Sequence, residues 1–192
     1  MVLPHVLQRD GLVVSEGAGV VVLESERHAA KRGAKPLAEL CAGAYLCESS
    51  HMSQSNDVQM VKVMTEALSR AEIKKEDIEY INAHATGTLQ GDAAEATAVR
   101  NLFGSQTPVS SLKAHFGHSM AACGAIELIA TVKMMDEEIL IATRNLEEVA
   151  SECAGVLHLK KNLKQSTKIA LSNNFAFGGI NTSFILRKMS SS

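Results

Sequence analysis

The stretch that decides the fold is Ser110-Ser111-Leu112-Lys113-Ala114-His115-Phe116-Gly117-His118-Ser119-Met120-Ala121-Ala122-Cys123-Gly124. It continues a short apolar strand predicted over residues 107–110, and it carries a lysine and two histidines into a helix rich in small residues. Proteins of the α/β class place chemistry where a strand ends, a polar loop follows and a helix begins. The stretch therefore predicts an α/β fold with a site at the end of this strand.

The helix expected over residues 119–137 is apolar nearly all the way round, which is typical of a buried helix. Glu127 lies in its middle, where an unpaired buried carboxylate would be unfavourable. A buried Glu127 needs a cationic partner, and Lys113 is the nearest candidate in the pattern. The alternative is that Glu127 is exposed on a small polar stripe.

Length and composition describe one globular domain. The chain has 192 residues with 46% hydrophobic residues and three prolines, enough for a substantial core. Its net charge of −2 gives no sign of a nucleic-acid or membrane partner. We also find no stretch of about 20 apolar residues and no signal peptide. The four cysteines form no CxxC pair, so we expect reduced thiols and a cytoplasmic protein.

The remaining elements alternate between strands and helices, with a few antiparallel additions. Two glycines near residue 18 imply a close backbone approach or a bulge. Residues 51–57 and 173–181 are expected to be loops, and Asp92 with Glu95 reads as a capping box. The other expected strands cover residues 12–14, 20–23, 37–47, 78–83, 156–159, 168–172 and 182–186, and the other helices cover 24–32, 57–71 and 92–103.

Three strand ends carry polar chemistry: His84 with Thr86 and Thr88, Lys113 with His118, and the segment 173–181. Residues at neighbouring strand ends of an α/β sheet converge on one crevice. Two imidazoles and a lysine there would supply donors to a developing enolate or oxyanion. The alternative for each histidine alone is a structural hydrogen-bonding role.

Two further signals are ambiguous. His115 and His118 have the HxxH spacing of a zinc site, but no third ligand stands out, so we expect no metal. Cys123 lies among small residues on the helix, and we interpret it as a buried, inert thiol.

Four ordered motifs resemble the C-terminal half of the β-ketoacyl-acyl carrier protein synthases, the condensing enzymes with a thiolase fold. The resemblance runs from about residue 9 to residue 186, and the motifs cover residues 9–19, 82–92, 113–124 and 173–181. It implies a thiolase-like layered α/β/α half with a mixed five-stranded sheet, forming one C-terminal domain over residues 1–192. It also implies decarboxylative Claisen condensation of a malonyl thioester with an acyl thioester, in fatty-acid or polyketide-type synthesis, without a cofactor.

Residue roles follow from the same resemblance. His84 and His118 would hydrogen-bond the malonyl thioester carbonyl, and Lys113 would pair with Glu127. The phosphopantetheine arm and substrate would contact Thr86, Thr88 and Phe175. Phe177 would be the gatekeeping aromatic, with its backbone N–H serving as an oxyanion-hole donor.

The sequence also departs from the family pattern. Ala85, Ala176 and Ile180 stand where smaller or different residues are usual, and Leu89-Gln90 replaces a Pro-Leu pair. These changes add bulk near the expected channel or reduce backbone freedom. They leave the histidines and Lys113 intact but bear on chain-length preference.

The nucleophilic cysteine of the family belongs to an N-terminal half, and none of the four cysteines here has that context. We therefore expect the chain to be inactive alone, because the thiolate must hold the acyl group. Its expected partners are acyl carrier protein and an N-terminal ketosynthase half, in a homo- or heterodimer, and alone it would expose an apolar face. The alternative function is that of a non-catalytic partner similar to a chain-length factor. A coenzyme A-dependent degradative thiolase fits the loops poorly.

Overall fold

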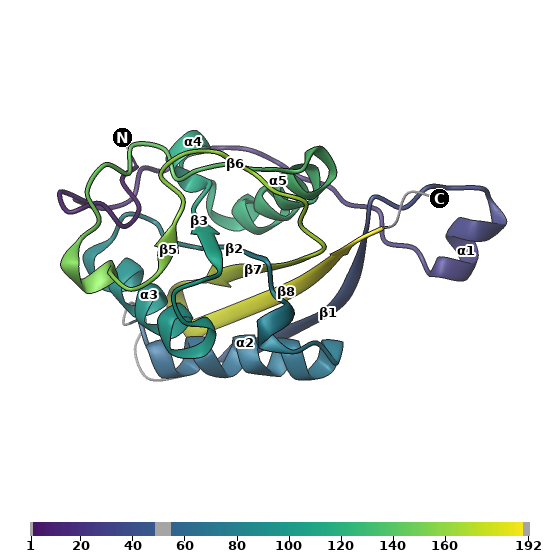
Figure 1. Ribbon diagram of the computed structural model, residues 1–192, viewed down its shortest axis with the longest axis horizontal. Coiled ribbons are helices and arrows are strands. Elements are labelled where there is room, and N and C mark those ends of the chain that lie inside the picture. The colour runs from purple at the N-terminus through teal and green to yellow at the C-terminus, as the bar shows by residue number, and fades with distance from the viewer. Residues whose placement is uncertain (1, 49–54, 190–192) are drawn as a thin grey trace.

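A six-stranded sheet forms the middle layer of the molecule, with α2 and α3 on one face and α5 on the other (Figure 1). The computed structural model describes residues 2–48 and 55–189. Its helices are α1 Glu26–Lys31, α2 Asp57–Ala71, α3 Leu89–Phe103, α4 Lys113–Phe116 and α5 Cys123–Glu137, with 3-10 turns η1 Lys75–Asp77, η2 Met120–Ala122, η3 Ser151–Cys153 and η4 Phe177–Gly179. Its strands are β1 Ala38–Cys47, β2 Tyr80–Asn82, β3 Pro108–Ser110, β4 Ile139–Leu140, β5 Leu157–His158, β6 Leu163–Lys164, β7 Ile169–Phe175 and β8 Ile180–Lys188.

The sheet is mixed, as expected, and has six strands instead of five. The strand order is β1-β8-β7-β2-β3-β5, and β4 and β6 form a separate two-stranded ribbon. The pairs β1–β8 and β8–β7 are antiparallel, whereas β7, β2, β3 and β5 run parallel to one another. Because β7, β2 and β3 are parallel neighbours, their carboxyl ends meet at one edge of the sheet. All three polar segments singled out in the sequence leave from that edge.

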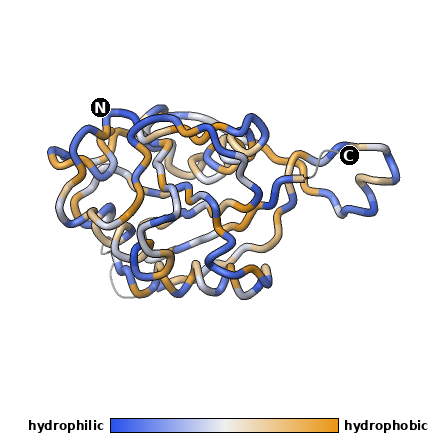
Figure 2. The backbone as a smooth tube through the Cα atoms, viewed as in Figure 1, coloured by the Kyte–Doolittle hydropathy of each residue, from blue (hydrophilic) through white to orange (hydrophobic). Residues whose placement is uncertain are grey.

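Two hydrophobic cores hold the layers together. One core lies between the sheet and the helices α2 and α3, and the other lies between the sheet and α5. Figure 2 shows hydrophobic segments running through the sheet, while the arm that carries α1 is mostly hydrophilic. The first core is built from fully buried residues that include Val63, Met64, Ile81 and Leu171; the second includes Tyr80, Met135, Leu140 and Leu186.

The strands expected over residues 12–14 and 20–23 are wrong: the structure gives these segments no ladder, only an isolated bridge between Val14 and His118. A strand needs a neighbour for its N–H and C=O groups, and no described segment lies beside residues 20–23 in that way. Val20 and Val22 are 86% and 82% exposed. The close approach expected of the glycines is confirmed, since a Cβ on Gly17 or Gly19 would press against side chains of α5.

Several boundaries differ from expectation. Helix α1 is shorter than expected, and α3 begins at Leu89 instead of Asp92. The last loop contracts to residues 176–179, because β7 and β8 pair as far as Phe175 and Asn181. Helix α5 begins at Cys123 and buries a stripe, so it is not buried all round. Of the loop expected over residues 51–57, residues 51–54 lie outside the described part of the chain.

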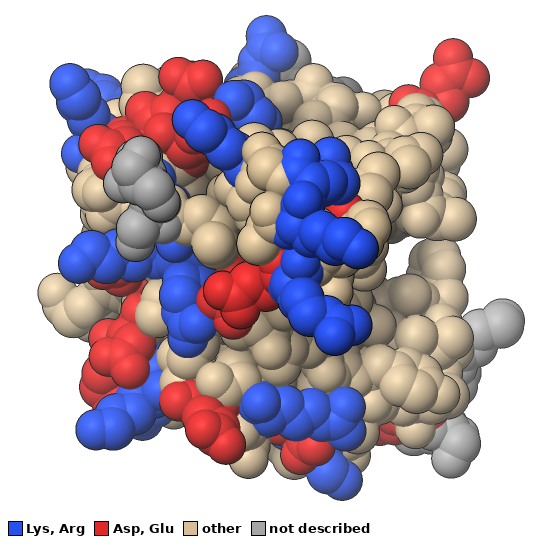
Figure 3. Space-filling model, turned by 90° about the vertical axis from the view of Figure 1, so that its right-hand side faces the viewer, with Lys and Arg blue, Asp and Glu red and all other residues tan. Residues whose placement is uncertain are grey.

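The surface at the α1 end mixes charges of both signs (Figure 3). Arg32 forms an ion pair with Glu24 beside α1, and Arg187 on β8 pairs with Glu39 on β1 at 2.6 Å. Exposed pairs of this kind add little to stability. Within the described ranges, no helix combines the length and the hydrophobicity that a membrane crossing requires.

Candidate active site

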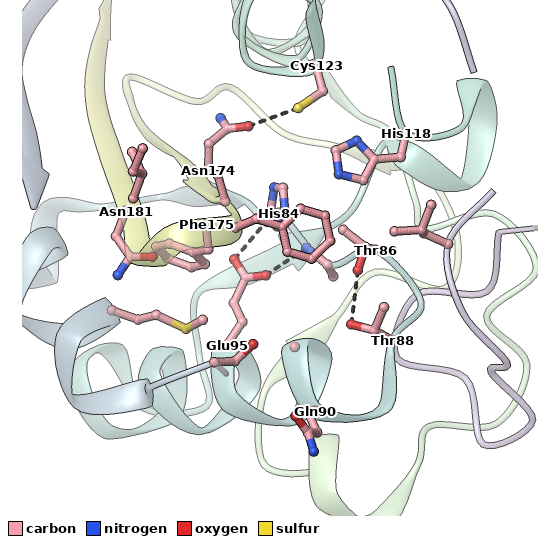
Figure 4. Close-up of a pocket in the computed structure, with 18 of the residues that line it drawn as sticks. His84, Thr86, Thr88, Gln90, Glu95, His118, Cys123, Asn174, Phe175 and Asn181 are labelled. Atoms are coloured by element: carbon pink, nitrogen blue, oxygen red, sulfur yellow. Dashed lines mark hydrogen bonds between the residues drawn. The ribbon is translucent and has the colours of Figure 1, made fainter. Parts of the chain in front are cut away.

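A cavity of about 920 Å³ opens at the sheet edge where β2 and β7 end. Its walls bring together side chains from segments that are distant in sequence, including the expected histidines, threonines and phenylalanines (Figure 4). The predicted site residues that line it are His84, Thr86, Thr88, His118, Phe175 and Phe177, and Cys123 and Asn174 lie among them. The convergence predicted from three strand ends is therefore present.

His84 and His118 meet edge to face, with ring centroids 5.4 Å apart and planes 86° apart. Nδ1 of His118 accepts a hydrogen bond from the Met120 N–H at 3.1 Å. A neutral imidazole that accepts at Nδ1 carries its proton on Nε2, so His118 has a donor to offer. Burial, followed by the Lys113 charge, lowers the pKa of both histidines, which keeps both rings neutral near pH 7.

Lys113 and Glu127 form the buried ion pair that the sequence suggested. Both side chains are fully buried, so the exposed-stripe alternative for Glu127 is wrong. Burial raises the pKa of Glu127, and the adjacent Lys113 opposes that rise. The pair lies behind the cavity wall and places a positive charge close enough to act on both imidazoles.

The loop that carries His84 is held by two carboxylates that the sequence analysis missed as site residues. Glu95 accepts the backbone N–H groups of His84 at 2.9 Å and Ala85 at 2.7 Å. Asp92 accepts those of Thr86 at 3.0 Å and Gly87 at 3.1 Å. The capping box expected for these two residues is wrong, because α3 begins before them and their carboxylates face the preceding loop.

These carboxylates are buried, which disfavours their charged forms. Burial raises the pKa of Asp92 to about 6 and that of Glu95 to about 7, although the backbone N–H donors work in the opposite direction. The signal that could have identified them is their i, i+3 spacing, which places both side chains on one face of the helix.

The segment before residue 10 clamps the same loop from outside. Arg9 is buried, and its guanidinium donates to the carbonyl oxygens of Thr88 and Leu89 and to the Glu152 carboxylate. Gly11 donates its N–H to the carbonyl of Gly87 at 3.0 Å. Gly87 has φ +85°, and a Cβ there would approach the Gly11 carbonyl oxygen within 2.9 Å, so this crossing requires glycine.

The turn after β7 places one aromatic side chain inside the cavity and one at its rim. Phe175 is buried, and its ring centroid lies 6.2 Å from that of His84. Phe177 is 64% exposed in η4 and lines the opening of the cavity. Gly179 has φ +72° and passes so close to the Glu48 carbonyl that a Cβ would overlap it. The path of the turn, and with it the position of Phe177, therefore depends on glycine.

The two ambiguous sequence signals separate in space. Nε2 of His115 donates to the Ala142 carbonyl at 2.9 Å, and His115 lines a different depression from His118, so the HxxH pair does not form one site. Cys123 is buried as expected, and its thiol donates to Asn174 Oδ1 at 3.3 Å. It faces the cavity beside His84, a position that the sequence did not reveal (Figure 4).

Comparison with known proteins accounts for this arrangement. The family model described as "Beta-ketoacyl synthase, C-terminal domain" matches residues 37–147, which is more than half of the chain. The chain belongs to the β-ketoacyl synthase family. The resemblance seen in the four motifs is confirmed, and the thiolase-like α/β fold agrees with solved ketosynthase structures.

Individual relatives within the β-ketoacyl synthase family cover nearly the whole chain. The chloroplastic 3-oxoacyl-[acyl-carrier-protein] synthase II of Arabidopsis thaliana is 41% identical over 95% of this chain. The ishigamide ketosynthase/chain length factor structure matches with a TM-score of 0.95 and 29% identity over 98% of it. A type II polyketide synthase acyl carrier protein in complex with its ketosynthase matches with a TM-score of 0.92 and 31% identity over 97%. The chain spans only 35% of the first protein and 47% of each of the other two.

Proposed function

We propose that this chain is the part of a 3-oxoacyl-acyl carrier protein synthase that decarboxylates a malonyl thioester. The observation that supports this most directly is the meeting of His84 and His118, since His118 has Nδ1 occupied and Nε2 available as a donor. Two neutral donors directed into one partly apolar cavity are suited to stabilise an enolate oxygen.

In the proposed reaction the malonyl thioester carbonyl accepts hydrogen bonds from His84 and His118. The bond between the malonyl α-carbon and its carboxylate breaks, carbon dioxide leaves, and the electron pair of that bond forms the enolate. The enolate carbon then attacks an acyl thioester, and the thiolate that held the acyl group departs. His84 and His118 carry no charge of their own, so they contribute by donating hydrogen bonds to the oxygen on which negative charge develops.

The remaining residues would prepare the site. Lys113, fixed by Glu127, adds positive potential behind the histidines and favours the enolate. Thr86 and Thr88, whose hydroxyls lie 3.1 Å apart, would contact the phosphopantetheine arm at the cavity mouth. Phe175 would pack against the substrate, while Phe177 would gate entry and its N–H would donate to the oxyanion of the condensation step.

A cysteine outside these 192 residues would hold the acyl group, so we propose that the chain is inactive by itself. Among the described cysteines, Cys41 and Cys123 have pKa values raised by burial, and that of Cys153 is raised to about 12, which suits none of them as a thiolate nucleophile. The exposed valines of residues 20–23 are an apolar surface suited to packing against the missing half. Acyl carrier protein would deliver the malonyl group, in a homo- or heterodimeric enzyme.

The test combines this chain with the cysteine-bearing half and supplies malonyl-acyl carrier protein. Mass spectrometry then measures the rate at which the malonyl group loses carbon dioxide. We expect His118→Ala to slow carbon dioxide loss by about 10²–10³-fold while acyl transfer to the cysteine continues. His115→Gln is the matched control, because His115 lies three residues before His118, in α4, but lines another depression. Equal rates for His118→Ala and the unmodified chain would refute the proposed role of His118.

A second candidate function is a non-catalytic, chain-length-factor-like partner, which the ishigamide ketosynthase/chain length factor neighbour brings into consideration. Such a partner would have no use for the paired histidines and the buried Lys113. Decarboxylation that is absent in every combination, together with stable binding to a ketosynthase, would favour this second function.

A further inference from the structure

A nitrogen, a sulfur and an oxygen gather beside the cavity: His84 and Cys123 line its wall, and Glu127 lies behind that wall. His84 follows β2, whereas Cys123 and Glu127 lie one turn apart on α5, so the helix directs both side chains to one face. One ligand-type atom from each of the three residues lies within 4.8 Å of the other two. The three residues were not connected by the sequence pattern, which drew attention only to the HxxH pair.

Two polar atoms of this cluster lack hydrogen-bond partners in the described part of the chain. They are Nδ1 of His84 and Oε2 of Glu127, and the Glu127 side chain is fully buried. Asn174 and Asn82 lie close enough to influence the pKa values of the two residues, but without the geometry of a hydrogen bond. Buried polar atoms are almost always satisfied, so two unsatisfied atoms on residues of one such cluster point to a bound ligand.

We propose that His84, Cys123 and Glu127 form a binding site for Zn²⁺, and that its occupancy switches the active site off. Imidazole, thiolate and carboxylate are the three ligand types that zinc takes in proteins, whereas Mg²⁺ and Ca²⁺ require oxygen ligands. A water molecule from the cavity, which His84 and Cys123 line, would complete the coordination. Lys113 occupies Oε1 of Glu127, which leaves Oε2 for the metal.

The regulatory part of this inference rests on the proposed function, because a metal on His84 removes that ring from the thioester carbonyl. Binding converts the thiol to a thiolate and releases its proton, so affinity rises with pH. Zinc adds two positive charges and the thiolate one negative charge, so the Lys113 ammonium opposes binding and keeps the affinity moderate.

The experiment is a titration of the full chain with Co²⁺ alone, followed by displacement with Zn²⁺. A thiolate-to-cobalt charge-transfer band is expected at one equivalent and should disappear when Zn²⁺ is added. Cys123→Ala should abolish the band and weaken Zn²⁺ binding by at least ~10-fold, the lower range for disturbed metal sites. Cys41→Ala is the matched control, since it removes a partly buried thiol from β1 and should leave the band unchanged.

Lys113→Met provides a second test in the opposite direction. It removes the opposing charge, so it should tighten Zn²⁺ binding, and Zn²⁺ should raise the thermal stability of this variant more than that of the unmodified chain. A missing band, a band retained in Cys123→Ala or Cys123→Ser, or weaker binding in Lys113→Met would overturn the site. None of these readouts uses malonyl decarboxylation, so failure of the metal site and failure of the proposed function are distinguishable.

Discussion

Replacing Lys113 by Met tests whether the buried ion pair organises the site. The substitution keeps a long apolar side chain of similar volume and removes only the charged end. Glu127 then remains on α5 with no accessible surface and without its partner. Its carboxylate must either stay charged in an apolar environment or take up a proton.

The expected loss of stability follows from leaving the Glu127 carboxylate buried without its partner. Breaking a buried pair by removing one partner lowers the free energy of unfolding by roughly 3–5 kcal/mol. The folded pKa of Glu127 rises further in the variant, so the sign of the pH effect is fixed. A raised carboxyl pKa gives stability that is present at low pH and is lost as pH rises through the folded pKa. We therefore expect the loss of stability to be largest at about pH 8. It should shrink as the pH falls towards the pKa of an unperturbed glutamic acid side chain.

Urea unfolding followed by circular dichroism at several pH values measures the deficit. Lys133→Met is the matched control, because Lys133 lies on the same helix in an exposed pair with Asp136, and it should leave stability unchanged. The double variant Lys113→Met/Glu127→Leu should regain most of the loss, since a buried pair can be replaced by apolar groups at little cost. A Lys113→Met chain as stable as the unmodified one at every pH would refute the reasoning.

Two further predictions concern the borders of the site. Burial lowers the pKa of His5 well below 6.5, so the contribution of His5 to stability is fully present above pH 6.5 and is lost as the pH falls. His5→Phe should therefore flatten the acid limb of a curve of unfolding free energy against pH. An unchanged acid limb would contradict this role of His5. Gly179→Ala should cost more than the ~1–2 kcal/mol of a left-handed alanine, because its Cβ also overlaps the Glu48 carbonyl, whereas Gly178→Ala, with φ +77° and open space, should cost only the conformational part in the same urea assay. Equal losses for the two variants would contradict the overlap.

Predictions from sequence succeeded where a local pattern and the final environment agreed. The amphipathic helix over residues 57–71 forms as α2 within the predicted boundaries, because its apolar face packs on the sheet. The partner of Glu127 was predictable for a related reason, since a buried carboxylate requires a cation and Lys113 was the nearest. The motifs were sufficient to indicate the β-ketoacyl synthase family.

Other features depended on contacts that no local pattern encodes. Residues 20–23 have the composition of a strand but find no neighbour in the described chain, so they remain exposed and without regular secondary structure. Asp92 and Glu95 have the spacing of a cap, yet their carboxylates hold the His84 loop because β2 and α3 enclose it. Tertiary packing made that choice, since each buried backbone N–H must find an acceptor and these were the carboxylates within reach.

The sequence by itself determined the three long helices, the main strands, the family and several of the residues that meet in the cavity, because periodicity, turn residues and ordered motifs are local properties. Only the tertiary structure decided how those residues face one another: the edge-to-face histidines, the tautomer of His118 and the position of Cys123 beside His84. The physical reason is that hydrogen-bond geometry and burial depend on segments that are distant in the chain. The carboxyl ends of the parallel strands β2, β3 and β7 bring these segments together.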